Sequence, residues 1–476
     1  MTLLRRIGAL IAPALLAASQ HCVAQSDRCD PKTFAPAYFR ILEDCGGRAA
    51  LRANSPQRSG LQALRYLPLD ADDPLAFASL GGEARLRWER LDPQRFGLAG
   101  GHPFTARGER LLLHADLHRD AWRAFVQLGA AGEVNWPAAR AADKSEPDVA
   151  QAFIDWQFDG KMGAASARRL RLGRFELPFP TNRMVGVNDA ANLRRTFQGA
   201  MLDIGIARTP LTAFVARPIV NKTGDFDDHW ARTERFSGLD AVLLQSSGGA
   251  AALDSIDAFV FDRYRAWGQV QNAAGAEHVQ TWGTRWAAHV GGLHGAVQAT
   301  LQHGRLGGQR MDGNGLTIDL AESLGGRWSP TLTVSFGRAS GDARPGDGRV
   351  DTFDPLYANL AYSTDAGYFY PGNNEDISVA LSLQPVASLQ VQAGAYSIRR
   401  IQSQDAAYQP PGLVLVPGNG TGGQHLATLP FLRATLQVDR YDETLVSLVR
   451  LVPRGVLEAA RARMSTYALL QWTFRF

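Results

Sequence analysis

Hydrophobic and polar residues alternate with a period of two along most of this chain, from about Leu80 to its last residue. In the stretch 110–118, the odd-numbered residues are apolar, and the even-numbered residues are polar apart from Leu112. The stretch 82–89 behaves likewise, with its charged residues on one face. A period of two predicts a β-strand with two unlike faces, whereas a helix would repeat every 3.6 residues. One apolar face and one charged face are typical of a membrane barrel with lipid outside and water inside.

About eighteen such segments follow one another, and they predict an all-β fold, a transmembrane antiparallel β-barrel of about 18 strands. After the N-terminal segment, no apolar run reaches the roughly 18 residues of a spanning helix. A closed barrel then remains as a way to cross a membrane, because every backbone polar group must be paired there. The predicted strands are 80–91, 108–119, 121–133, 148–158, 168–176, 198–207, 211–220, 237–246, 254–263, 278–289, 292–305, 314–325, 328–341, 375–384, 388–400, 427–438, 442–452 and 465–476.

The connections between these segments alternate in length. The odd-numbered connections are mostly long, at 134–147, 177–197, 221–236, 342–374 and 401–425. The even-numbered ones are mostly short, around Asp120, Pro210, Gly291, Gly326, Pro385 and Arg440. Long loops on one side and tight turns on the other are typical of outer-membrane barrels. The pattern therefore predicts that both termini are periplasmic and that the long loops face outward.

The last ten residues form the clearest single strand. Ala468, Leu470, Trp472, Phe474 and Phe476 share one face, and Gln471, Thr473 and Arg475 lie on the other. An alternating strand that closes on an aromatic residue is what we expect barrel-assembly machinery to recognise. Aromatic residues at such positions are typical of the girdle at a membrane–water interface.

The N-terminus predicts export. Arg5 and Arg6 precede an apolar run at 7–19, and a small-residue cleavage site follows at 22–24. We therefore predict a signal peptide at 1–24, a periplasmic extension at 25–79 that lacks the alternation, and an outer-membrane barrel at 80–476. A buried N-terminal helix and lipidation at Cys22 are the alternatives.

Composition adds two expectations. Cys29 and Cys45 are the cysteines that remain after cleavage, and in an oxidising compartment they predict one local disulfide. The net charge of +4 is too small to indicate a nucleic-acid partner. All of the 50 basic residues are arginine except the lysines, which are Lys32, Lys144, Lys161 and Lys222. A GC-rich genome would explain this bias, and so would recognition of carboxylates or phosphates by the planar guanidinium group.

Four stretches resemble the alginate export family of outer-membrane porins. They are LRYLPL at 64–69 with LGGEARLRWE at 80–89, QAFID at 151–155 with LGRFEL at 172–177, NLRRTFQGA at 192–200, and SGDARPGDGRVDTFDPLY at 340–357. The resemblance implies an eighteen-stranded barrel whose arginine-lined lumen passes an anionic polysaccharide. The third stretch departs from the family, which usually carries an acidic residue where Gln198 precedes Gly199.

The alternation and the resemblance together predict residues that line the pore. The basic candidates are Arg85, Arg87, Arg110, Arg123, Arg171, Arg174, Arg183, Arg194 and Arg195, and the others are Asp155, Glu176 and Asn192. Arginine rings favour anions in a pore, and interleaved acids would keep a polymer from binding too tightly to move. The alternative is that these residues form structural ion pairs. The connection 177–197 is predicted to fold inward as a constriction rather than to remain an exposed loop.

One strand carries a second candidate cluster. His114, Asp116 and His118 lie on one predicted strand face. Consecutive residues on a strand face are about 7 Å apart, and the sequence offers neither a fourth ligand nor a nucleophile motif. Pore lining is therefore preferred to a metal site or a hydrolytic pair.

The sequence thus predicts a passive outer-membrane channel, not an enzyme, that conducts an anionic polysaccharide such as alginate outward without cofactor or metal. Expected partners are that polymer or a small anion, outer-membrane lipid and lipopolysaccharide, barrel-assembly machinery and periplasmic export components. One alternative is an uptake porin for sugar acids or aromatic acids. Others are a barrel hydrolase that uses His114 and His118, and an adhesive or structural barrel that uses loops 342–374 and 401–425.

Overall fold

The computed structural model describes most of the chain after its N-terminal segment. The described residues are 60–476 except 74–75, 137–142, 159–167, 178, 180–182, 206–209, 247–248, 250, 360, 362 and 421–422. The predicted signal peptide and the predicted Cys29–Cys45 disulfide lie outside the described residues. In the described part, no helix combines the length and the apolar character needed to cross a membrane.

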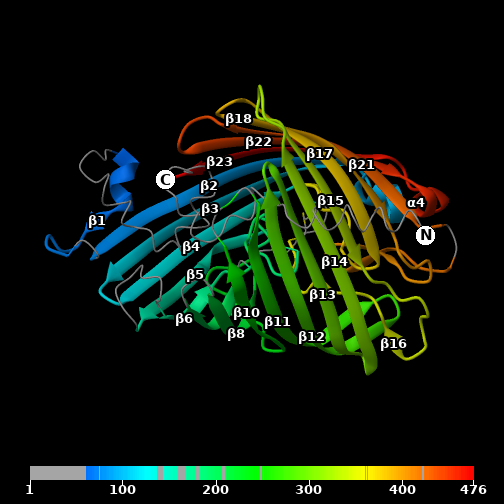
Figure 1. Cartoon of the computed structure of the whole chain (residues 1–476), viewed down its shortest axis with the longest axis horizontal. Coiled ribbons are helices and arrows are strands. Elements are labelled where there is room, and N and C mark those ends of the chain that lie inside the picture. The colour runs from blue at the N-terminus through cyan, green and yellow to red at the C-terminus, as the bar shows by residue number, and fades with distance from the viewer. Residues whose placement is uncertain are drawn as a thin grey trace.

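Within the described residues, eighteen strands form a closed antiparallel β-barrel (Figure 1). Each strand pairs with the next in the chain, and β23 pairs with β2 to close the ring. The predicted fold class is therefore confirmed, and each predicted segment overlaps one barrel strand. The strands are β2 (Phe77–Asp92), β3 (Phe104–Arg119), β4 (Trp122–Val134), β5 (Ser145–Gln157), β6 (Arg168–Phe175), β7 (Phe197–Ile204), β8 (Leu211–Val220), β10 (Glu234–Gln245), β11 (Ala251–Val270), β12 (Ala273–Val290), β13 (Leu293–Leu306), β14 (Gln309–Ser323), β15 (Thr331–Ala339), β17 (Asn374–Val386), β18 (Leu389–Arg399), β21 (His425–Gln437), β22 (Asp442–Pro453) and β23 (Ser465–Arg475).

Short elements decorate the barrel. Before β2 lie η4 (Gly60–Arg65) and β1 (Leu67–Pro68), and β1 pairs with the start of β2. Between the barrel strands lie η5 (Gln94–Gly100), β9 (His229–Trp230), β16 (Arg349–Val350), the hairpin of β19 (Ala407–Gln409) and β20 (Leu413–Val416), and α4 (Gly455–Ala459).

The two faces of the strands are inverted relative to a water-soluble protein. On β3, Leu111, Leu113 and Leu117 are 46–47% exposed, whereas Arg110 and Asp116 are buried. Exposed apolar side chains continue around the barrel on the outward face of other strands, for example at Trp282 of β12 and Leu301 of β13. A polypeptide gains nothing by exposing leucine to water, so this outer band is suited to face lipid.

The barrel closes at the chain terminus. Phe476 and Gly82 exchange two backbone hydrogen bonds, of 3.1 and 3.2 Å, beyond the last residue of β23. A Cβ atom at Gly82 would lie 2.7 Å from the carbonyl oxygen of Leu112 and 2.9 Å from the Phe476 ring. Glycine at this position therefore permits the terminal aromatic residue to pack over the seam.

The connections differ between the two ends of the barrel. The end that holds Phe476 has short turns at 120–121, 291–292, 387–388 and 438–441, whereas the opposite end has long loops at 93–103, 176–196, 340–373 and 400–424. In Figure 1 the C-terminus accordingly lies at the end away from α4. Two connections at the long-loop end are turns, at 271–272 and 307–308. β11 and β12 extend beyond the predicted segments 254–263 and 278–289, and β14 begins at Gln309, before the predicted segment 314–325.

Gly82→Val is expected to lower the unfolding free energy by about 1–3 kcal/mol, because overpacking at the seam displaces either Phe476 or β3. The measurement is denaturant unfolding of the refolded barrel, followed by the mobility shift of unheated protein in gels. Ala84→Val is the matched control. The Ala84 side chain lies on the same strand and on the same face as Gly82, but outside the Phe476 contact. Equal stability of the two variants would contradict the role given to Gly82.

Candidate functional site

Two of the long loops fold into the barrel and meet inside it. One joins β6 to β7 (176–196), and the other joins β15 to β17 (340–373). Val185 and Tyr357 form an isolated parallel bridge between them. The backbone N–H of Gly186 donates to the Tyr357 carbonyl at 3.0 Å, and the Tyr357 N–H donates to the Met184 carbonyl at 2.9 Å. We call residues 183–195 and 353–357 together the lumenal bridge.

Arginines of β2 and β3 hold the first half of the lumenal bridge. The Arg85 guanidinium donates to the carbonyls of Asp189 and Ala191, both at 2.7 Å, and to the Asn192 side-chain oxygen at 3.0 Å. Arg110 donates to the Asn192 carbonyl at 3.2 Å and to the Asp189 carboxylate at 3.1 Å. A guanidinium offers five donors in one plane, so a single side chain can satisfy several loop carbonyls.

Other predicted residues join the same contact. Arg87 donates to the Ala190 carbonyl and, at 2.9 Å, to Glu89. Asn192 donates its backbone N–H to Asp143 at 3.0 Å and its side-chain N–H to the Gly132 carbonyl at 3.1 Å.

Arg194 connects this half of the lumenal bridge to three carboxylates. It lies 2.7 Å from Asp189, 3.5 Å from Glu83 and 3.6 Å from Glu176. Arg85, Arg87, Arg110 and Asn192 are buried. The structure therefore brings these predicted pore residues together at the anchor of a loop.

The second half of the lumenal bridge is held by the opposite wall. Asp354 accepts hydrogen bonds from Arg263 of β11 at 2.6 Å and from Arg265 at 2.8 Å. Both arginines also bind Glu277 of β12, at 2.6 and 2.5 Å. Gln302 of β13 accepts the Asp354 N–H at 2.9 Å. In the described barrel, β2 is first and β11 ninth of the eighteen strands, so the two anchors face each other across the lumen (Figure 1).

The middle of the lumenal bridge is apolar. The Tyr357 ring lies 5.2 Å from the Phe197 ring and 4.7 Å from the Phe236 ring, and its hydroxyl donates to Glu234 at 2.6 Å. Arg195 donates to the carbonyls of Gly186, at 3.0 Å, and of Tyr357. Burial and the nearby Glu234 carboxylate raise the pKa of Tyr357. A small hydrophobic core thus connects the two loops inside the barrel. The described part of 177–197 follows the predicted inward course.

A ladder of alternating charges crosses the inner wall from β3 to β7. Arg123 lies 2.9 Å from Asp116 and 3.4 Å from Asp155. Arg171 binds both oxygens of Asp155, at 2.7 and 2.9 Å. Arg169 continues the ladder to Asp203 at 2.5 Å. Successive strands thus present arginine and aspartate alternately, in the interleaved arrangement that the sequence predicted for Arg123, Asp155 and Arg171.

Arg183 and Arg174 lie apart from these anchors. Arg183 is on the lumenal bridge, 3.0 Å from Asp319 of β14, and its side chain is 23% exposed. Arg174 lies 3.6 Å from Asp148 and donates to the Asp228 carbonyl at 3.2 Å.

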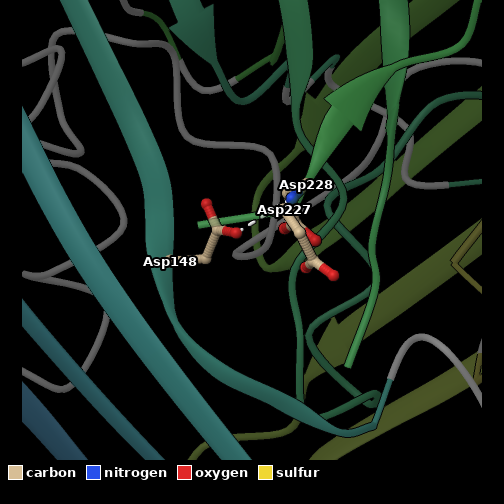
Figure 2. Close-up of side chains that lie close together, drawn as sticks. All are labelled: Asp148, Asp227 and Asp228. Carbon is tan, nitrogen blue, oxygen red and sulfur yellow. Dashed lines mark hydrogen bonds between the residues drawn. The ribbon is translucent and has the colours of Figure 1, made fainter. Parts of the chain in front are cut away.

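Among the described residues, the carboxylates of Asp148, Asp227 and Asp228 lie close enough together to hold a metal ion (Figure 2). The Asp228 N–H donates to Asp148 at 3.0 Å. Because the Arg174 guanidinium already supplies positive charge beside Asp148, we assign no metal to this group.

The histidine cluster lies on the inward face of β3, as the alternation predicted. His118 Nε2 lies 2.8 Å from Asp116, and the His118 ring stacks on Phe77 with a centroid distance of 4.6 Å. Asp116 is also held by Arg123 at 2.9 Å. The arrangement is that of a packed ion-pair network on the lumen wall.

Several residues that anchor the second half of the lumenal bridge were not predicted as site residues. They are Arg263, Arg265, Glu277, Gln302 and Asp354. In the sequence, the stretch 352–357 carries a signal only through the family resemblance. Two features of the sequence could nevertheless have identified the anchor. Asp354 is the charged residue of an otherwise mostly apolar stretch that contains a proline, and arginines occur at inward positions beyond the apolar band.

The chain was compared with known families and structures. A family model described as alginate export matches residues 77–471. Acinetobacter baumannii OccAB1 has a TM-score of 0.58 at 8% identity, over 84% of this chain and 96% of that chain. Pseudomonas aeruginosa OccK2 (OpdF) in complex with glucuronate has a TM-score of 0.53 at 12% identity, over 84% and 96%. Pseudomonas aeruginosa OpdK with vanillate has a TM-score of 0.51 at 10% identity, over 83% and 98%. At these identities the likeness shows a shared fold; the comparison with curated proteins found no match.

Asp354→Asn is expected to lower the unfolding free energy by about 3–5 kcal/mol at pH 7, because it removes the partner of two arginines at a buried site. Burial raises the pKa of Asp354, but Arg263 and Arg265 outweigh burial and hold it at about 2. A carboxyl whose pKa is lowered stabilises the fold above its ordinary pKa of about 4, and this contribution is lost as the pH falls toward 2.

The measurement is the stability difference between wild type and Asp354→Asn, determined at pH 7 and at pH 2–3. The difference should shrink at low pH, which separates Asp354 from other carboxylates that titrate in both proteins. Asp351→Asn is the control, since that side chain is 37% exposed and 3.5 Å from Arg349, and it should cost under about 1 kcal/mol. A difference that stays constant with pH would contradict the anchor.

Proposed function

The chain belongs to the alginate export family and has the fold of outer-membrane porins, and from this premise we propose that it is a passive channel that conducts an anionic polysaccharide such as alginate outward. The observation that carries the proposal is the family match, which extends over residues 77–471 and so covers nearly the whole barrel. Family and fold indicate an outer-membrane channel rather than an enzyme. A passive channel needs a gradient, which other components of the cell would supply.

The charges of the lumen suit a polyuronate. Each sugar of alginate carries one carboxylate, which can replace an aspartate as the partner of an arginine. In the ladder from Asp116 to Asp203 every arginine already has a carboxylate within 3.4 Å. At the end of the ladder that solvent reaches, the Arg169 and Asp203 side chains are 17% and 25% exposed, so a polymer carboxylate would exchange with Asp203 there instead of meeting a bare cation. Conduction needs binding that is repeated and weak, and such exchange supplies it.

The lumenal bridge is proposed as the constriction of this channel. It crosses the lumen between the β2–β3 wall and the β11–β13 wall, so a chain would pass beside it. Arg183 is the bridge residue that we assign to polymer contact, since its side chain is 23% exposed. Arg85, Arg87, Arg110, Arg194 and Arg195 would act by positioning the loop.

The remaining expectations extend the proposal. The periplasmic position of both termini rests on the loop asymmetry described above. Lipopolysaccharide, barrel-assembly machinery and periplasmic export components are proposed partners. The predicted division into signal peptide, extension and barrel at 24, 79 and 476 stays a prediction.

Uptake of small anions is the second candidate function. Its support is the likeness to OccK2, whose structure holds glucuronate, and to OpdK, whose structure holds vanillate. A channel for sugar acids or aromatic acids would use the same arginines. The two candidates differ in the length of the solute that enters the lumen, and a blocking experiment separates them.

In a planar bilayer, the protein is expected to conduct anions in preference to cations, and soluble polyuronate is expected to block the current at concentrations that leave neutral dextran without effect. Arg183→Gln should raise the half-blocking concentration about 3- to 10-fold, because one polymer contact is lost. Arg90→Gln is the matched control, since Arg90 is a 56% exposed arginine on the outward face of β2.

Each outcome favours one candidate. Block by polyuronate, weakened by Arg183→Gln alone, supports export of the polymer. Block by monomeric glucuronate but not by polyuronate supports small-anion uptake. Absence of current from correctly folded barrel would overturn both proposals.

A further inference from the structure

A groove lies on the outer wall of the barrel, at the long-loop end of β14. It has a volume of about 590 Å³, and it is lined by β13, β14 and β15 and by parts of loops 340–373 and 400–424. β15 pairs with β14 only as far as Gly315, and β16 pairs with it again at Arg310 and Met311. In the described chain, strand pairing on this side is therefore interrupted at residues 312–314, where Ser340 donates its backbone N–H to the Asn314 carbonyl at 2.8 Å.

The groove faces away from the lumen. Met311 and Val350, which pair side by side, are fully buried in the inner hydrophobic core. Side chains alternate along a strand, so their neighbours Arg310 and Asp312 point outward. On the same outward face Leu301 is 65% exposed and Ile377 is 50% exposed. The groove thus lies directly beyond the apolar band that faces lipid.

Arginine surrounds the upper side of the groove. The Asp312 carboxylate contacts the side chains of Arg310 at 2.5 Å, Arg349 at 3.3 Å and His303 at 2.7 Å. Arg349 also lies 3.5 Å from Asp351. One carboxylate therefore serves two guanidinium groups and an imidazole, which leaves guanidinium donors available to a further anion.

The lower side has more arginines than carboxylates. Glu375 forms ion pairs with Arg338 at 3.1 Å and with Arg399 at 3.5 Å. The four arginines of this patch, Arg310, Arg338, Arg349 and Arg399, are 47–59% exposed, and the described residues provide Asp312, Asp351 and Glu375 as their carboxylate partners. The patch is thus positive, and its exposed guanidinium planes suit phosphate, which they bind in a bidentate manner.

We propose that this outer groove binds the phosphorylated headgroup of a glycolipid of the outer leaflet, namely lipid A of lipopolysaccharide. The arginines bind the phosphates, and the exposed apolar residues below them contact the acyl chains. The volume lies within the roughly 300–1,000 Å³ that is usual for small-ligand sites. The proposal rests on the outer-membrane location and on the outward position of the long loops, but it does not depend on what the lumen conducts.

The test is binding of defined lipid A to the delipidated full-length barrel in detergent, measured by native mass spectrometry. Diphosphorylated lipid A is expected to bind at least tenfold more tightly than its fully dephosphorylated form, since charge-assisted hydrogen bonds are lost. Arg338→Gln with Arg349→Gln should weaken binding of the diphosphorylated form by at least tenfold. High salt should weaken it as well, because exposed charges are screened.

The matched control is Arg90→Gln with Arg107→Gln. These two arginines are 56% and 50% exposed on the outward face of β2 and β3, in another sector of the barrel, and their loss should change binding less than twofold. Equal loss in both double variants would overturn the groove as the site. Equal binding of the phosphorylated and dephosphorylated forms to the wild type would overturn phosphate recognition, even if a variant failed to fold. If millimolar inorganic phosphate by itself displaced the bound lipid A, the acyl chains would contribute nothing to binding. This result would overturn lipid A as the occupant.

Anion current and polyuronate block in both double variants, measured in the same preparations, keep this result separate from the channel function. Neither variant removes a residue of the lumen, so the current should match that of the wild type. A loss of lipid A binding with unchanged current supports the groove. Unchanged lipid A binding in the groove variant overturns the groove without affecting the proposed channel.

Discussion

Arginine side chains of the barrel wall hold the interior of this protein in place, and the shape of the lumen depends on them. Arg85 and Arg110 reach loop carbonyls on one wall, and Arg263 reaches Asp354 on the other. Loop backbone inside a barrel must exchange its water contacts for others, and an unpaired buried carbonyl is costly. The guanidinium meets this demand with several donors in one plane, so a few side chains can fix a long irregular segment. The abundance of arginine in this chain therefore has a structural reason as well as an electrostatic one.

The fold could be predicted from alternation because the lipid-facing band forces each strand to carry one apolar face. Where that constraint ends, the signal ends too. The apolar band of β11 and β12 ends where Asp262 and His278 form an exposed pair on the outward face, and from there the two strands continue to Val270 and from Ala273. Polar residues on both faces carry no amphipathic pattern, so the predicted segments stopped short. For the same reason, the sequence predicts the short turns more accurately than the strand ends at the long-loop end.

Only one part of the candidate site could be predicted from the sequence, namely the side chains that point inward. Alternation shows which residues point inward, and it correctly placed Arg123, Asp155 and Arg171 on one wall. It does not show what covers that wall. The partners of Arg85 lie more than 100 residues away in a loop, and those of Asp354 lie about 90 residues before it. Such contacts depend on the closure of the whole barrel, which no local pattern of residues encodes.

The position of the lumenal bridge also affects the mechanics of the barrel. A closed sheet changes from a circle to an ellipse by small bends at every strand, and it keeps all of its hydrogen bonds while doing so. A tie between β2 and β11, on nearly opposite sides, resists elongation along that diameter and leaves the perpendicular diameter to respond. Lateral pressure from the membrane would then be converted into a change of lumen shape along one axis. The bridge thus gives the barrel one stiff diameter, set by the contacts at β2 and at β11.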